Sequence, residues 1–116
     1  MASAHERLQA ARATLAGGFP SSAVSAGYYA MLYAARAALS EEERNAKTHR
    51  GVWSLFSEAF VTSGRFERGL FAAAQRAQDL REAADYEAGS VSPEQADAIL
   101  TDADRFVSAV ASMLGA

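Results

Sequence analysis

The chain has 116 residues, of which half are hydrophobic, and its 11 basic and 14 acidic side chains give a formal net charge of −3. This length fits one domain with a core of its own. The acidic balance argues against binding of polyanions over the whole surface, although a local basic patch could still hold a phosphate. Cysteine is missing from the sequence, which excludes disulfides, thiolate metal sites and cysteine nucleophiles.

No stretch approaches the roughly 18 consecutive apolar residues of a membrane-spanning helix. The first seven residues include Glu6 and are followed by no hydrophobic run, so they do not form a signal peptide. We therefore expect a cytoplasmic protein that does not enter a membrane.

Glycines and prolines divide the chain into five segments. Residues 3–16 are predicted to form a helix, with a capping box from Ser3 to Glu6 and an end at Gly17-Gly18. Residues 20–39 form a second helix with two stripes, and the second stripe carries Tyr29, Tyr33 and Arg36. Two such faces predict a central helix that contacts neighbours on both sides. Residues 40–47 are highly charged without apolar periodicity, and are interpreted as a loop.

The second half of the chain predicts three more helices. One covers 49–63 with Thr48 as its N-cap, and the next covers 65–87 with apolar residues at spacings of 4, 3, 4, 3 and 4. The last begins at Ser92-Pro93-Glu94-Gln95, which matches a capping box with proline in the first turn. With short connections and no strand pattern, we expect an all-α, antiparallel up-and-down bundle of four to five helices, forming one domain over 1–116.

His49 is the strongest candidate for chemistry. It falls in the first turn of the third predicted helix, where the helix dipole favours an anion and disfavours imidazolium. Arg44, Lys47 and Arg50 lie within six positions of it. A neutral imidazole beside fixed cations could bind or cleave a phosphodiester. The plainer alternative, a solvated basic loop with a histidine next to a helix cap, stays open at this point.

Other polar groups have plainer interpretations. Arg81 and Asp85 are four residues apart, with Tyr86 adjacent, and this spacing favours an ion pair on a helix surface over a cluster that orients the site loop. Tyr28, Tyr29 and Tyr33 are typical of core or interface positions. The spacing of Asp97, Asp102 and Asp104 does not bring three carboxylates to one helix face, so we assign no metal site, and no motif implies a cofactor.

Three blocks in order resemble small stand-alone HEPN proteins, and together they cover nearly the whole chain. The Tyr-Tyr-Ala sequence at 28–30, with the alanine-rich end of the same helix, resembles the family's second helix. Residues 47–51 resemble its Lys-x-His-x-Gly segment, with Phe56 and Phe60-Val61 downstream. Residues 81–86 resemble its Arg-x3-Asp-Tyr motif.

The resemblance implies a helical bundle that pairs as a homodimer, a toxin-type role beside a nucleotidyltransferase antitoxin, and metal-independent cleavage of RNA. The segment from Arg44 to His49 matches the family's Arg-x4-6-His signature by count. His49 would then act as general base or acid on the ribose 2′-OH reaction, with Arg44 or Lys47 stabilising charge on the phosphate. Arg50 and Thr48 would contact the phosphate.

The same resemblance implies that Arg81, Asp85, Tyr86 and Tyr29 form a supporting polar cluster. Two-fold pairing would bring two copies of His49 together, so that one histidine per chain could supply both base and acid. The tyrosine that many toxin members carry two residues after the histidine is Gly51 here, so its modification is not carried over. Two alternatives remain: a non-catalytic module that binds a nucleotide or a protein partner, and a structural helical dimer. We expect a catalytic centre to hold Arg44 or Lys47 beside His49, and a binding module to have Arg44 directed elsewhere.

Overall fold

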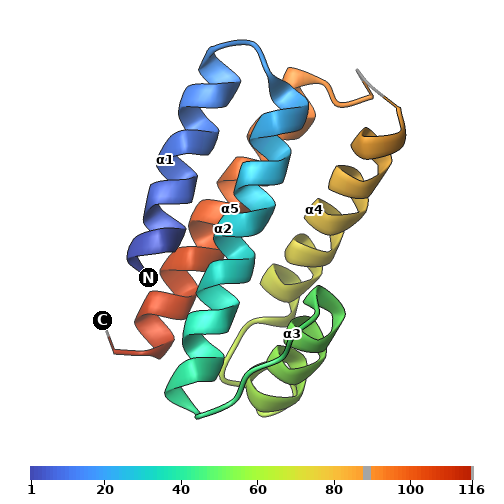
Figure 1. Cartoon of the computed structure of the whole chain (residues 1–116). Coiled ribbons are helices and arrows are strands. Elements are labelled where there is room, and N and C mark those ends of the chain that lie inside the picture. The colour runs from blue at the N-terminus through green and yellow to red at the C-terminus, as the bar shows by residue number, and fades with distance from the viewer. Residues whose placement is uncertain (88–89, 116) are drawn as a thin grey trace.

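The computed structural model describes residues 1–87 and 90–115. Four long helices run alternately up and down, with a short fifth beside the lower ends of two of them (Figure 1). Their bounds are α1 (Ala2–Ala16), α2 (Pro20–Glu41), α3 (His49–Phe56), α4 (Arg68–Tyr86) and α5 (Pro93–Met113), and a π-helical segment, η1 (Ser57–Val61), continues α3. Within the described ranges no residue is in a strand. The prediction of an all-α antiparallel bundle is therefore confirmed.

Helix α2 is the central element of the bundle. It contacts α1, α3, α4 and α5, which confirms the prediction of a helix with neighbours on both sides. Eleven of its 22 residues are buried. Gly27 lies where α2 meets α5, and a Cβ atom at this position would be 2.6 Å from Cδ2 of the buried Leu100. Glycine is therefore needed here because it has no Cβ atom, which lets the two helices approach closely. An unusual backbone angle is not the reason.

Three predicted helix starts can be compared with the structure. The capping box at Ser3 is wrong, because α1 begins one residue earlier, with Met1 as N-cap and no side-chain cap, and the Met1 carbonyl accepts from the His5 amide at 3.1 Å. The Thr48 cap is confirmed, since its hydroxyl accepts from the Gly51 amide at 2.9 Å. The box at Ser92 is also confirmed, with both of its reciprocal hydrogen bonds formed.

The predicted helix over 49–63 is α-helical only as far as Phe56. The next turn is π-helical, with the Thr62 amide donating to the Ser57 carbonyl at 2.9 Å. Because a π turn joins residues five apart, it turns Val61 towards the side of Phe56, and both are buried. The α-helical pattern alone would have placed Val61 elsewhere around the axis.

The predicted start of the fourth helix at 65 is also wrong, because α4 begins at Arg68. Phe66 instead belongs to the connection, where its amide donates to the Phe60 carbonyl at 2.9 Å. Its ring is buried 4.9 Å from the rings of Phe56 and Phe106. The side chain joins the core as the pattern predicted, but the backbone that carries it is not helical.

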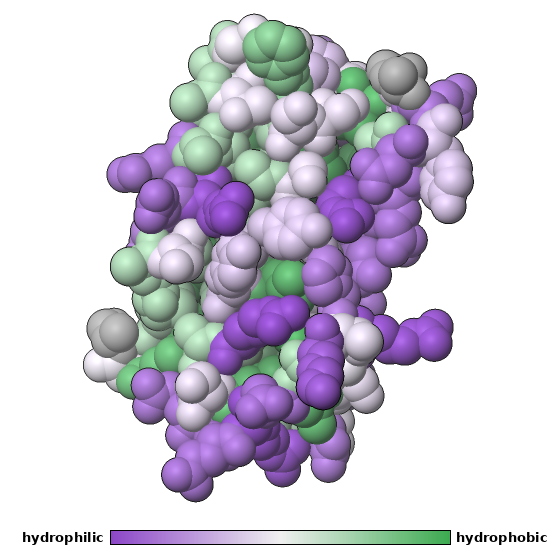
Figure 2. Space-filling model, viewed as in Figure 1, coloured by the Kyte–Doolittle hydropathy of each residue, from purple (hydrophilic) through white to green (hydrophobic). Residues whose placement is uncertain are grey.

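The described helices include none long and apolar enough to cross a membrane. On the face seen in Figure 2, strongly hydrophilic side chains gather at the lower end of the molecule, over the connection between α2 and α3. The side chains at the upper end, over the turn between α1 and α2, are less polar. His49 contacts Tyr28 and Tyr29, which lie near the middle of α2, so the candidate chemistry lies near the middle of the bundle and not at this polar end.

The close approach of α2 and α5 gives a test of the packing. Gly27→Ala should lower the free energy of unfolding by about 1–3 kcal/mol, because the added methyl overpacks the contact with Leu100. Gly69→Ala is the matched control, because its new methyl would meet only a carboxylate oxygen of the exposed Glu67. Urea titrations of both variants measure the difference, and an unchanged or raised stability for Gly27→Ala would contradict this account.

Candidate functional site

His49 is the first residue of α3 and leans against α2. Its Nδ1 lies 3.2 Å from the Tyr28 hydroxyl oxygen, and the same oxygen accepts a hydrogen bond from the Trp53 indole N–H at 3.0 Å. Tyr28 has no exposed surface, and Trp53 is only 3% exposed. Because the two rings are fixed in the core, they hold the half-buried imidazole in one place at the surface of the bundle.

Two of the predicted supporting residues meet at this histidine. The edge of the Tyr29 ring packs against the imidazole, with centroids 5.7 Å apart and planes at 84°. The Arg81 guanidinium lies 5.3 Å from the ring centroids of both Tyr28 and Tyr29, and its Nη2 donates to the Tyr29 hydroxyl at 3.3 Å. Arg81 thus belongs to a cluster with His49, although 32 positions of sequence separate them. The interpretation as a simple surface ion pair was too narrow.

The other two predicted supporting residues lie outside this cluster. Asp85 forms an ion pair with Arg81, with 3.6 Å between nitrogen and oxygen, and its side chain is mostly exposed. Tyr86 is 93% exposed, and no interaction with the cluster is described for it. Asp85 can help to orient Arg81 from outside, whereas Tyr86 projects into solvent.

The surroundings of His49 favour its neutral form. Burial is the largest influence that lowers its pKa below the ordinary value, and the charges of Arg81 and Arg36 lower it further. Glu82 acts in the opposite direction but less strongly. The lowered pKa has the same direction as the predicted preference for a neutral imidazole. Its causes are burial and two arginines on other helices, which the sequence did not indicate.

Arg36 was missed as a site residue. It extends from α2, donates to the Ala46 carbonyl at 3.5 Å and so ties down the connection that leads to His49. The signal that could have found it is the stripe it shares with Tyr29 and Tyr33, because residues at these spacings lie on one face of a helix. Tyr28 was assigned to a core or interface position, and the sequence did not indicate that its hydroxyl would contact His49.

Arg44 and Lys47, the two cations that the sequence placed beside His49, make no described contact with it. Arg44 is exposed and forms a long ion pair with Glu58 of η1, at 3.9 Å, and Lys47 is an exposed residue of the same connection. None of the interactions described for residues 1–87 and 90–115 joins either side chain to His49. The Thr48 hydroxyl is engaged in capping α3. The positive charges that act on His49 therefore come from Arg36 and Arg81.

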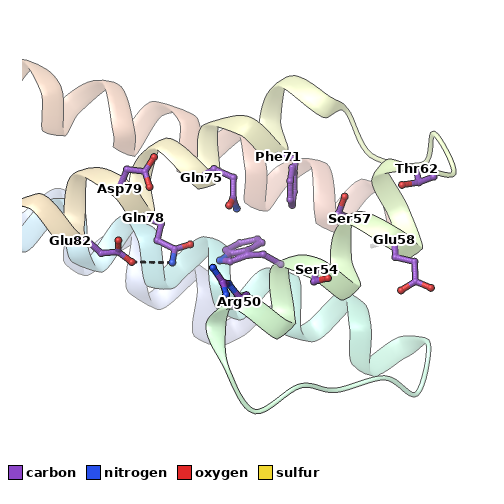
Figure 3. Close-up of a pocket in the computed structure, with 11 residues that line it drawn as sticks. Arg50, Ser54, Ser57, Glu58, Thr62, Phe71, Gln75, Gln78, Asp79 and Glu82 are labelled. Atoms are coloured by element: carbon purple, nitrogen blue, oxygen red, sulfur yellow. Dashed lines mark hydrogen bonds between the residues drawn. The ribbon is translucent and has the colours of Figure 1, made fainter.

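A cleft of about 660 Å³ lies between α3–η1 and α4 (Figure 3). Arg50 is at the α3 side of this cleft, and Trp53 contributes to its floor while also bonding Tyr28. Three carboxylates, those of Glu58, Asp79 and Glu82, line it against one arginine. This charge balance disfavours a phosphate in the cleft. The two arginines that act on His49, Arg36 and Arg81, do not line this cleft.

The pKa assignment can be tested at Arg81. Arg81→Gln removes a positive charge near the imidazole, so the pKa of His49 should rise towards its ordinary value. An NMR titration of the imidazole protons measures this shift. Arg76→Gln, on the same helix but paired with Asp102, is the control and should leave the pKa of His49 unchanged. A lowered pKa in Arg81→Gln would refute the proposed charge arrangement.

The same lowered pKa has a consequence for stability. Below the ordinary pKa of histidine, about 6.5, the unfolded chain binds a proton at this position more readily than the folded chain does. The folded state should therefore lose stability as the pH falls from about 7.5 towards the lowered pKa. In His49→Gln this part of the pH dependence should disappear, as measured by chemical unfolding at a series of pH values. A slope identical to that of the original chain would contradict the assignment.

Comparisons with known proteins agree with the helical arrangement and the motif blocks. The HEPN domain model matches residues 1–113. "Putative toxin MJ0605" of Methanocaldococcus jannaschii is 32% identical over 111 residues, covering 96% of this chain and 83% of that protein. "Putative toxin MJ0142" of the same organism is 35% identical over 79 residues, covering 67% of this chain and 54% of its own length.

A third relative comes from another organism. "UPF0332 protein glr0978" of Gloeobacter violaceus is 33% identical over 106 residues, covering 90% of this chain and 84% of that protein. The family match spans α1 to α5, including the cluster that α2, α3 and α4 build around His49. This chain therefore belongs to the HEPN domain family.

Proposed function

We propose that this protein is the toxin of a toxin–antitoxin pair and that its His49 centre cleaves RNA without a metal. The observation that carries the proposal is a half-buried imidazole packed against Tyr29, whose hydroxyl accepts a hydrogen bond from Arg81. The charges of Arg81 and Arg36 both lower the pKa of this histidine. Two relatives named as toxins support the toxin role. The antitoxin would be a nucleotidyltransferase, as the sequence resemblance implies.

The reaction would be attack of a ribose 2′-OH on the adjacent phosphate. A bond forms between O2′ and phosphorus, the bond from phosphorus to O5′ breaks, and the 2′-OH proton is lost while O5′ gains one. Arg81 and Arg36 would stabilise the negative charge that grows on the phosphate oxygens. The imidazole of His49 would form a hydrogen bond to the substrate or exchange a proton with it. In this assignment Arg81 stabilises charge on the phosphate, which is the role that the sequence analysis gave to Arg44.

The homodimer belongs to the same proposal. An RNA phosphate needs access to the imidazole of His49. If a second copy of the chain packed next to this imidazole, the two-fold axis would bring the two His49 centres into one groove. We propose that the two centres lie close to the dimer axis.

A second function is favoured by the position of Arg44. Because this arginine pairs with Glu58, the counted Arg-x4-His motif does not form a spatial pair with His49. A non-catalytic HEPN module would use the same centre as an anion site, to bind a nucleotide or a protein partner. This alternative needs Arg36, Arg81 and His49 for binding but requires no proton transfer.

Purified protein without its antitoxin, incubated with RNA in chelator, distinguishes the two functions. We expect cleavage that leaves 2′,3′-cyclic phosphate ends, and a loss of about 10²-fold or more in rate for His49→Ala and for Arg81→Gln. Arg44→Gln should keep a rate near that of the original protein. His5→Ala is the matched control, because this other histidine is exposed on α1.

Two results would count against the nuclease. Absence of cleavage across several RNAs, with the fold intact, would leave the binding module. Cleavage that depends on Arg44 and not on Arg81 would overturn the assignment of the cation while keeping the activity.

A further inference from the structure

The Tyr28 hydroxyl lies fully inside the protein and must find its hydrogen-bond partners there. Within the described part of the chain it has two, the Trp53 indole nitrogen at 3.0 Å and Nδ1 of His49 at 3.2 Å. Tyr28 has no surface in contact with solvent. Buried hydroxyl groups in folded proteins are nearly always satisfied, so both the oxygen and the proton of this group need to be accounted for.

The two partners differ in what they can do. An indole N–H only donates, so Trp53 uses a lone pair of the Tyr28 oxygen and cannot receive the Tyr28 proton. Nδ1 of His49 is the one acceptor described for that proton. A chain of donation therefore runs from Trp53 through Tyr28 to His49. The hydrogen positions follow here from the capacity of each group to donate or accept.

We infer that Tyr28, held by Trp53, is a positioning residue that fixes neutral His49 as the tautomer with its proton on Nε2. Nδ1 is occupied as an acceptor, so the proton of the neutral ring must reside on the other nitrogen. The opposite tautomer would place two donors, Trp53 and Nδ1–H, on one oxygen and would leave the buried Tyr28 proton without an acceptor. Protonation of Nδ1 in imidazolium would create the same conflict.

This tautomer changes the role of His49 in the proposed function, on which this step of the inference rests. Nε2 lies on the side of the ring away from Nδ1, and there it presents a hydrogen-bond donor. The charged groups that act on the ring are Arg36 from α2 and Arg81 and Glu82 from α4. Together, Nε2–H and two guanidinium groups form a set of donors suited to the oxygens of a phosphodiester. His49 would therefore stabilise the phosphate, while the 2′-OH proton would pass to solvent water and the departing O5′ would take a proton from solvent water.

The tautomer can be measured without any RNA. In His5→Ala protein, His49 is the only imidazole, and long-range ¹H–¹⁵N correlation spectra at a pH where the ring is neutral identify the protonated nitrogen. We expect Nε2 to carry the proton in at least tenfold excess. Tyr28→Phe removes the hydroxyl and keeps the ring, so it should give a mixture of both tautomers. Tyr29→Phe is the matched control, because its hydroxyl bonds to Arg81, and it should keep the Nε2–H form.

If the spectrum of the His5→Ala protein showed the proton on Nδ1, or equal amounts of the two tautomers, the inference would be overturned. This holds even if Tyr28→Phe failed to fold. An unchanged tautomer in a folded Tyr28→Phe would also overturn it. The RNA assay gives a separate result: with His49 as donor, Tyr28→Phe should cleave roughly tenfold more slowly, as when a histidine loses an orienting partner. If His49 were a base at Nε2, freeing Nδ1 should raise the rate. Nε2–H without any RNA cleavage would refute the proposed nuclease and leave the tautomer assignment intact.

Discussion

The burial of α2 is the constraint on which the rest of the molecule depends. This helix contacts α1, α3, α4 and α5, and half of its residues are buried among them. Many of its residues are alanine, whose small side chain lets neighbouring helices pack closely. At Gly27, where α5 packs against α2, even a Cβ atom would be too close to Leu100. Interiors packed at this density leave side chains few positions. Tyr28 is held in such a place, and the orientation of His49 follows from it.

The site is therefore a product of three helices that meet, and not of one motif. Arg36 and the two tyrosines come from α2, His49 and Trp53 from α3, and Arg81 from α4. The short α3–η1 unit extends beside the lower ends of α2 and α4 (Figure 1). Its π-helical turn directs Val61 and Phe60 into the aromatic core, which fixes the far end of α3 while Thr48 fixes the near end. Because both ends of the α3–η1 unit are fixed, the backbone of His49 is held in a defined position.

Charge is distributed unevenly around α3. The cleft towards α4 is lined by three carboxylates and one arginine, whereas two arginines and one carboxylate act on the imidazole of His49. Interactions between charges a few ångströms apart outweigh a net charge spread over the whole surface, so the acidic balance of the chain does not argue against the phosphate contacts proposed for His49. Glu82 borders both regions, since it lines the cleft and also acts on His49.

The sequence by itself determined the helical class, the order of the five helices and the Thr48 and Ser92 caps. These features depend on local periodicity and on side chains within four residues of one another, which a linear pattern records directly. Only the tertiary structure decided which cations reach the histidine. Arg44 lies five positions away and pairs with Glu58, whereas Arg81 lies 32 positions away and packs on Tyr28 and Tyr29. The physical reason is that the connection before α3 carries Arg44 along the surface, while the crossing of α2 and α4 brings distant residues into one cluster.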